Sequence, residues 1–281
     1  MADVTARGAL ADAADSAGNA RSDAPDTAWD ATLLVASHKP YWMPADPLYL
    51  PVCVGANANG PLEGFAPDNT GDNISHKNDR YSELTALWWG WRNVECSALG
   101  LVHYRRHFAG KGERKTLLWE EAVALLDRVP AIVPKPRNYV IESVASHYAH
   151  THDPAHLEAL RAAIGEVSPQ HVGAFDRQMA STKAHMFNML LMRREVLDPY
   201  CTWLFNVLAA CERRIDFDGM SAFEQRCVGR LAEFLLDVWL LDEDVPYAEV
   251  PLRELEGINW VKKGRAFLGA KFLGKGYDKS F

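Results

Sequence analysis

The sequence has no paired cysteines, no long apolar run and no excess of positive charge. Its five cysteines include no C-x-x-C pair, so neither a disulfide framework nor a structural zinc site is expected. No segment approaches the roughly 20 apolar residues that cross a bilayer, and no secretory signal is recognisable at the N-terminus. We therefore expect a protein of the reducing cytoplasm, in which the thiols are small buried apolar side chains.

Several common functional classes also lack support. Thirty Lys and Arg against 37 Asp and Glu give a net charge of −7, which argues against nucleic acid as a partner. The sequence contains no G-x-S-x-G, Walker A, G-x-G-x-x-G, protein-kinase or H-E-x-x-H motif. The hydrolase, NTPase, dehydrogenase and zincin classes therefore lose their usual signatures.

Composition divides the 281 residues into three parts. Residues 1–30 are rich in Ala, Asp and Ser and have few large apolar side chains, which predicts a disordered leader. Residues 31–260 have the composition of a folded domain. Residues 261–281 mix six Lys and Arg with aromatic residues and carry one Asp. This tail is either a solvated end or a contact with an anionic membrane surface, on the inner face of the membrane.

Strand and helix patterns alternate in the first half of the domain. Short β-favouring runs predict buried strands at 32–37, 98–102 and 131–133, and amphipathic spacing predicts helices at 82–93, with Ser82 as the N-cap, and at 117–128. This order predicts an α/β fold with a mostly parallel central sheet flanked by helices. The second half is more helical, with expected helices at 154–164, 196–208 and 223–239 and a strand at 187–192.

Polar residues follow two of the predicted strands directly. His38 and Lys39 come after the first, and His103, Tyr104, Arg105 and Arg106 come after the second. Ligands of parallel α/β sheets bind beyond the carboxyl ends of strands, and guanidinium groups match phosphate oxygens. The pattern predicts a phosphate or diphosphate site, and a surface ion-pair cluster is the simpler alternative.

Other polar clusters allow two interpretations each. Asp72, Asn73, Lys77 and Asn78 lie in a Gly- and Asn-rich loop that suits either a nucleotide or a plain capped loop. The aromatic and His-rich stretch 139–152 suits a saccharide surface, whereas zinc at its histidines lacks accompanying ligands. On the predicted helix 223–239, Glu233 is either part of a solvated face with Arg226 and Arg230 or a general base.

Five stretches, taken in order, resemble one family. The chain is similar to the bacterial capsular and exopolysaccharide glycosyltransferases of domain-of-unknown-function family 4422 over about residues 32–255. The matching stretches are Val35–Lys39 with Tyr49–Gly55, Gly71–Ser75 with Lys77–Asn78 and Tyr81–Trp88, Gly100–Arg106, Asn188–Met192, and Tyr200–Cys201 with Trp203–Leu204.

This resemblance implies a GT-A-like fold and transfer of a sugar, with inversion, from a UDP-sugar to a lipid-linked or oligosaccharide acceptor. UDP-galactofuranose is the implied donor, and capsule, exopolysaccharide or O-antigen synthesis the implied process. Most GT-A enzymes carry an Asp-x-Asp metal motif where this chain has His103–Arg106. We therefore expect Arg105 and Arg106 to replace the metal in stabilising the leaving diphosphate.

The resemblance also suggests roles for individual residues. Glu233 is the first candidate for the catalytic base and Asp72 the second. The donor residues expected are His38, Lys39, Asp72, Asn73, Lys77, Asn78, His103, Tyr104, Arg105 and Arg106, and the acceptor residues are His147, Tyr148, His185, Asn188 and Arg230. Two hypotheses compete with a glycosyltransferase. One is a non-catalytic nucleotide-sugar or carbohydrate-binding module, and the other is a phosphotransferase that uses the arginines.

Overall fold

The computed structural model describes residues 29–256, which form two compact units. Unit 1 consists of residues 29–134, 188–201 and 246–255, and unit 2 of residues 135–187, 202–245 and 256. Each unit is described by itself. The boundaries 31–260 of a single folded domain stay a prediction, and the predicted tail 261–281 and residues 1–28 of the leader lie outside the described residues.

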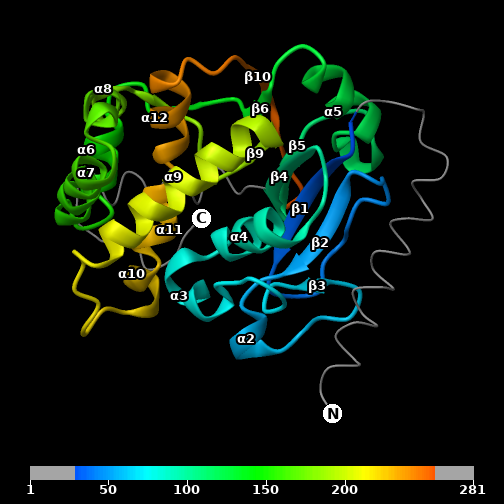
Figure 1. Ribbon diagram of the computed structural model, residues 1–281, viewed down its shortest axis with the longest axis horizontal. Helices are drawn as coiled ribbons and strands as arrows, with labels where there is room; N and C mark the ends of the chain where they lie inside the picture. Colours follow the sequence, from blue (N-terminus) through cyan, green and yellow to red (C-terminus); the bar gives the residue numbers. More distant parts are fainter. Residues whose placement is uncertain (1–28, 257–281) are drawn as a thin grey trace. The chain divides into compact units, whose positions relative to one another are not determined.

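Unit 1 is built on a mostly parallel sheet (Figure 1). The strand order is β10-β6-β9-β4-β1-β2-β3, β5 pairs with the last residue of β4, and β11 pairs with β5. Every pair in the main order is parallel except those of β9, which runs against both β4 and β6. The predicted α/β class is therefore confirmed. The strands are β1 (Ala31–Ser37), β2 (Tyr49–Cys53), β3 (Ala66–Pro67), β4 (Ala98–His103), β5 (Arg106–Phe108), β6 (Ala131–Pro134), β9 (Leu190–Arg193), β10 (Tyr247–Val250) and β11 (Leu252–Glu254).

The two predicted apolar runs form the centre of this sheet. All seven residues of β1 and the first five of β4 are buried, and Leu34 of β1 is paired with Leu101 of β4. Each such leucine contributes about 1.5–3 kcal/mol by leaving water. Helix α4 (Leu84–Asn93) packs closely on β1, because a Cβ at Gly90 would stand 2.3 Å from a methyl carbon of Leu34.

The predicted helix 82–93 is confirmed except at its start. Ser82 has φ +52°, whereas an N-cap residue is normally extended, and its carbonyl accepts a hydrogen bond from Asn78. Ser82 therefore forms the turn between two helices and is not the N-cap. The helical segments of unit 1 are α2 (Ala56–Asn59), the 3₁₀ turn η1 (Ser75–Lys77), α3 (Asn78–Tyr81), α4, the 3₁₀ turn η2 (Glu113–Lys115) and α5 (Trp119–Leu126).

Unit 2 is mainly helical, as expected for the second half of the chain. Helix α9 (Arg194–Glu212) starts in unit 1 and continues into unit 2. No helix among residues 29–256 combines the length and hydropathy that a bilayer span requires. The other elements of unit 2 are β7 (Arg137–Asn138), α6 (Val144–Ala149), α7 (Ala155–Val167), the 3₁₀ turn η3 (Pro169–His171), α8 (Val172–Ala180), β8 (Lys183–Ala184), α10 (Ala222–Gln225), α11 (Cys227–Ala232) and α12 (Leu235–Asp242).

The prediction of one long helix over 223–239 is wrong, because this segment forms three short helices. The chain leaves helical geometry at Arg226, where ψ is 9°. Eleven of the 14 residues from Cys227 to Leu240 are buried. A surface helix would bury only one stripe, so this segment turns repeatedly within the interior of unit 2. Arg226, Arg230 and Glu233 consequently do not share the face of one helix.

Candidate functional site

The carboxyl edge of the sheet in unit 1 collects the polar residues that follow the parallel strands. Ala36 near the end of β1 is paired with His103 at the end of β4. The next residues of both strands must therefore meet at this edge, as the strand pattern predicts. Gly55 follows β2 and Asp68 follows β3 at the same edge.

Tyr104 is the centre of a cluster of cationic and aromatic side chains at this edge. We call His38, Lys39, Tyr41, Tyr104 and Arg105 the Tyr104 cluster. The ring centroid of Tyr104 lies 5.4 Å from that of His38, 5.2 Å from Lys39 Nζ and 5.7 Å from Arg105 Cζ. Its ring also meets that of Tyr41 edge to face at 4.9 Å. An aromatic face holds cations near it, so the cluster gathers positive charge at one place.

Arg106 does not belong to this cluster, contrary to the prediction that both arginines bind a diphosphate. Its side chain is 8% exposed, and its Nε donates a hydrogen bond to Glu254 Oε1 at 3.1 Å. Arg106 is the first residue of β5, which pairs with β11. Arg105 lies in the two-residue turn between β4 and β5, where it stays partly exposed, whereas Arg106 enters the sheet and is buried.

Asp68 organises the loops around this edge, and nothing in the sequence singled it out. Its fully buried carboxylate accepts four hydrogen bonds. They come from the backbone N–H groups of Gly55 and Ala56, at 2.9 and 3.0 Å, and from the hydroxyls of Ser75 and Thr85, at 2.5 and 2.6 Å. One charged group therefore joins the end of β2, the loop before α3 and the start of α4.

Lys77 and Asn78 lie next to the segments that Asp68 joins. Asn78 Nδ2 donates to the carbonyl of Ser82 at 2.8 Å and to the Thr85 hydroxyl at 3.2 Å. Its Oδ1 would be 2.6 Å from a Cβ at Gly55, which has φ +69°. Lys77 Nζ lies 5.2 Å from the centre of the Tyr81 ring. The Asn78 amide group thus shapes the loop, and its contact with a donor stays a prediction.

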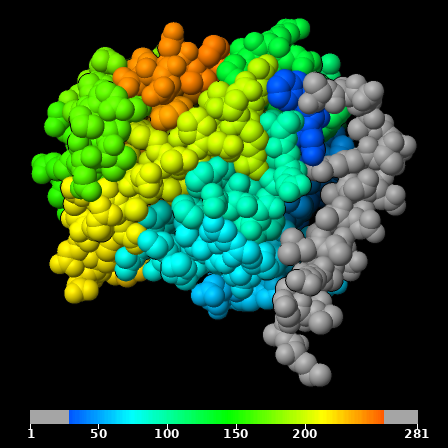
Figure 2. Space-filling view, viewed as in Figure 1, coloured from blue at the N-terminus to red at the C-terminus, as the bar shows by residue number. Residues whose placement is uncertain are grey.

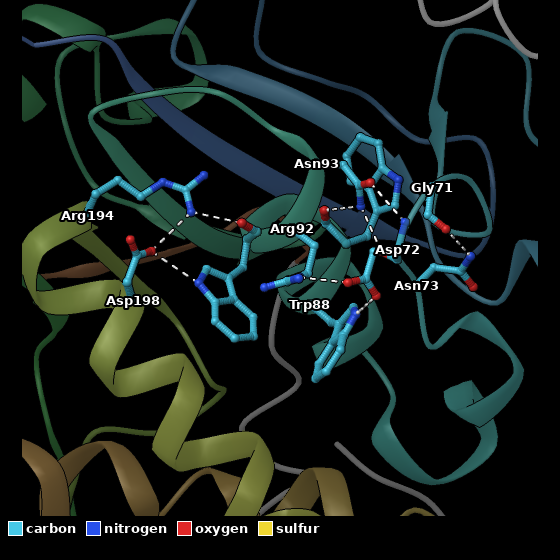
Figure 3. Close-up of polar contacts among 10 residues, drawn as sticks. Gly71, Asp72, Asn73, Trp88, Arg92, Asn93, Arg194 and Asp198 are labelled. Atoms are coloured by element: carbon cyan, nitrogen blue, oxygen red, sulfur yellow. Dashed lines mark hydrogen bonds and ion pairs between the residues drawn. The ribbon is translucent and has the colours of Figure 1, made fainter.

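Asn73 accepts the N–H of Ser75 at 3.2 Å, whereas Asp72 is bound by residues of α4 (Figure 3). The carboxylate of Asp72 accepts hydrogen bonds from Trp88 Nε1 at 3.0 Å and Arg92 Nε at 2.7 Å, and its N–H donates to Asn93 at 3.0 Å. These partners belong to the half of α4 that leads to the amino end of β4. The segment 71–93 is cyan in Figure 2, on the face turned to the viewer.

Asp72 is consequently a poor candidate for a base. Its hydrogen bonds from Trp88 and Arg92 lower the pKa of its carboxyl group, and a carboxylate with a lowered pKa accepts protons weakly. The nearby end of α4 is also fixed in place, because Arg194 Nη1 bonds the Trp91 carbonyl at 2.9 Å and contacts Asp198 (Figure 3). The contacts in this part of unit 1 therefore serve to hold α4 in place.

At the carboxyl edge, Asn188 contacts the carboxylate of Glu83, a residue that the sequence did not suggest as functional. Asn188 stands two residues before β9, whose first residue, Leu190, is paired with Leu101. The Asn188 side-chain amide donates to Glu83 Oε1 at 2.6 Å. Since β9 is antiparallel to β4, its preceding residues lie beyond the carboxyl end of β4. In the sequence, Glu83 is only the residue after Ser82 in the predicted helix 82–93.

Two of the four predicted acceptor residues of unit 2 are buried. Tyr148 is 3% exposed, and its hydroxyl lies 3.2 Å from His156 Nδ1. Burial raises the pKa of this tyrosine. His185 is 5% exposed, and its Nδ1 contacts Asp237, which also accepts from the His185 N–H at 2.9 Å. Only His147, with 22% of its side chain exposed, and Arg230 are accessible to a ligand among these four residues of unit 2.

Arg230 and Glu233 lie within unit 2 but make different contacts. Arg230 Cζ lies 4.0 Å from the centre of the Phe223 ring, and burial lowers the pKa of its guanidinium group. Glu233 Oε2 accepts the backbone N–H of Phe187 at 3.0 Å. A partly buried arginine against an aromatic ring suits a sugar or an anionic group.

The histidines of residues 147–152 do not form the zinc site considered from the sequence. His147 Nδ1 and His150 Nδ1 lie 3.3 and 3.4 Å from opposite oxygens of Glu142. Within the part of the chain that the structure describes, His147, His150 and His152 do not bring three ligand atoms within 4.8 Å of one another. The His152 ring lies instead 4.8 Å from the Tyr148 ring and 5.6 Å from the Phe223 ring, tilted to both.

Comparisons with known proteins agree with the fold. The profile of the family described as a domain of unknown function, DUF4422, matches residues 32–244. The apo structure of the bifunctional glycosyltransferase WbbM is similar with a TM-score of 0.74 and 24% sequence identity. The match covers 81% of this chain and 45% of that one, so the chain spans less than half of the length of WbbM. A search of the curated proteins finds no match.

Proposed function

Because the chain belongs to the DUF4422 family and shares its fold with part of a glycosyltransferase, we propose that it is a glycosyltransferase that uses a nucleotide-sugar donor. The observation that carries the proposal is the Tyr104 cluster at the carboxyl edge of the sheet. This edge is where α/β sheets bind nucleotides. Three side chains of the cluster, His38, Lys39 and Arg105, offer donors to a diphosphate.

The chemistry of sugar transfer explains why cations belong here. When the bond between the sugar and the diphosphate breaks, negative charge develops on the leaving phosphate oxygen. Lys39 and Arg105 would stabilise that charge from fixed positions around Tyr104. His103, the last residue of β4, is retained as a donor-binding candidate. Arg106 has no part in this step, because it is held by Glu254.

The residues at the end of β4 do not fit the Mn²⁺ site of most GT-A enzymes. Such a metal prefers carboxylate and water ligands, and the end of β4 offers an imidazole, a phenol and a guanidinium group. Lys39 and Arg105 should therefore stabilise the leaving nucleoside diphosphate without a metal ion.

Transfer with inversion needs a group that takes the proton of the acceptor hydroxyl. Glu233 of unit 2 stays the first candidate. Glu83 replaces Asp72 as the second, because Asp72 is bound by Trp88 and Arg92. Of the acceptor residues proposed for unit 2, His147 and Arg230 are retained, because Tyr148 and His185 are buried.

The donor, the acceptor and the process follow from the family resemblance. We propose UDP-galactofuranose as the first donor to test and a lipid-linked or oligosaccharide acceptor of capsule, exopolysaccharide or O-antigen synthesis. A protein acting on such acceptors would work in the cytoplasm at the inner face of the membrane.

A panel of UDP-sugars tests the proposal. The full chain is incubated with each sugar, with and without an oligosaccharide acceptor, and released UDP is measured. We expect acceptor-dependent release with one donor, and EDTA should leave it largely unchanged. Binding of a UDP-sugar without release would identify a non-catalytic module instead. Phosphate transfer from a phosphate ester without any sugar transfer would favour the phosphotransferase, and no binding at all would refute the assignment.

A further inference from the structure

A buried histidine in unit 2 packs beside a pair of tryptophan rings that also contact each other, with 5.3 Å between the centres of Trp203 and Trp239. His171, at the end of η3, is 2% exposed. The centre of its imidazole lies 5.7 Å from that of Trp239, with 9° between the ring planes, and 4.9 Å from that of Trp203. Trp203 is itself fixed by a 2.7 Å hydrogen bond from its Nε1 to the Ser168 hydroxyl. The plane of the His171 ring is therefore set by its neighbours.

Neither ring nitrogen of His171 makes a hydrogen bond within residues 29–256. A buried polar atom left in this way costs about 1–3 kcal/mol, so its position calls for an explanation. Nε2 is directed at two carboxylates, with Glu243 Oε1 at 3.2 Å and Asp242 Oδ2 at 3.6 Å. Asp242 is the last residue of α12 and Glu243 follows it, where the helix dipole favours a cation.

These separations match the edges of a metal coordination sphere. A tetrahedral ion with ligand bonds near 2.1 Å places neighbouring ligand atoms about 3.4 Å apart. The three ligand atoms of His171, Asp242 and Glu243 all lie within 4.8 Å of one another. The side chains of Asp242 and Glu243 are 23% and 45% exposed, so an ion can enter from solvent and keep a water ligand.

We propose that His171, Asp242 and Glu243 bind a divalent transition-metal ion, with Zn²⁺ as the first choice. One imidazole nitrogen with two carboxylates suits zinc, whereas Mg²⁺ and Ca²⁺ take oxygen ligands. The ion would link η3 to the end of α12 and neutralise the two carboxylates. None of the three residues has a role in the proposed transfer, and the site does not depend on that function.

Calorimetric titration of the tag-free full chain with ZnCl₂, after removal of metals with EDTA and dialysis, tests the site. We expect one saturable ion per chain, and Asp242→Asn combined with Glu243→Gln should weaken its binding at least tenfold. These partly exposed positions can change without opening the core, and His150→Gln, which alters an exposed histidine beside Glu142, is the matched control. Mg²⁺ should not compete with Zn²⁺.

A second readout is thermal stability. Zinc at about one hundred times its dissociation constant should raise the Tm of the wild-type chain by about 8 °C, and the double variant should show little change. Absence of saturable binding, equal affinity in the double variant, or effective competition by Mg²⁺ would overturn the proposal. A Tm that ignores zinc but falls as the pH rises would identify an imidazolium ion paired with the two carboxylates instead.

Discussion

Replacement of Asp68 should destabilise the protein more than any surface change in unit 1. Its buried carboxylate accepts hydrogen bonds from two backbone N–H groups and two hydroxyls. In Asp68→Ala the hydroxyls can turn to other acceptors, but the N–H groups of Gly55 and Ala56 cannot. Each buried donor left without a partner costs about 1–3 kcal/mol, so the loss should be about 4 kcal/mol. Asp68→Asn keeps one acceptor oxygen and should cost about 2 kcal/mol.

Urea unfolding followed by tryptophan fluorescence, together with thermal melts, measures these losses. At about 3 °C for each kcal/mol, the Tm should fall by about 6 °C in Asp68→Asn and about 12 °C in Asp68→Ala. Asp176→Asn is the matched control, because Asp176 pairs with Arg161 on the surface with half of each side chain exposed. If Asp68→Asn were as stable as the control, Asp68 would not join the loops as described.

The remaining predictions concern backbone geometry and pH. Gly55→Ala should lower the free energy of unfolding by about 2 kcal/mol more than Gly60→Ala in urea unfolding, because both have positive φ but only Gly55 faces a close neighbour, Asn78. Burial lowers the pKa of His107 to about 4. Its contribution to stability is present above pH 6.5 and is lost as the pH falls toward 4, so wild-type protein should lose about 3 kcal/mol more than His107→Gln over that range. Equal losses in Gly55→Ala and Gly60→Ala would contradict the close approach of Asn78 to Gly55. Equal losses in wild type and His107→Gln would contradict the lowered pKa of His107.

The sheet was predictable because its central strands are continuous apolar runs. β1 and β4 are buried on both faces, and only a parallel sheet covered by helices buries strands in this way. The same patterns place His38 and Arg105 together, since both follow neighbouring strands. Helix α4 was recognisable from its spacing of Leu and Trp residues.

The errors arise where a side chain's direction depends on distant segments. Arg105 and Arg106 are two consecutive arginines that the sequence cannot distinguish. Only the pairing of β5 with β11 brings Arg106 to Glu254. Asp68 and Asp72 both stand in a polar loop. Asp68 is buried at the centre of that loop, whereas Asp72 accepts a hydrogen bond from Trp88 on the surface of α4. Composition cannot separate a buried loop carboxylate from a solvated one, because the difference lies in which backbone N–H groups the fold brings to it.

The central claim is that fixed cations around Tyr104 stabilise the leaving diphosphate, and steady-state kinetics of Arg105→Ala test it most directly. With the donor found in the UDP-sugar panel, kcat should fall about 10²- to 10³-fold, the loss typical of removing one charge-stabilising donor. Arg161→Ala, which alters a surface ion pair of unit 2, should keep wild-type turnover. Wild-type kcat in a folded Arg105→Ala protein would contradict the account.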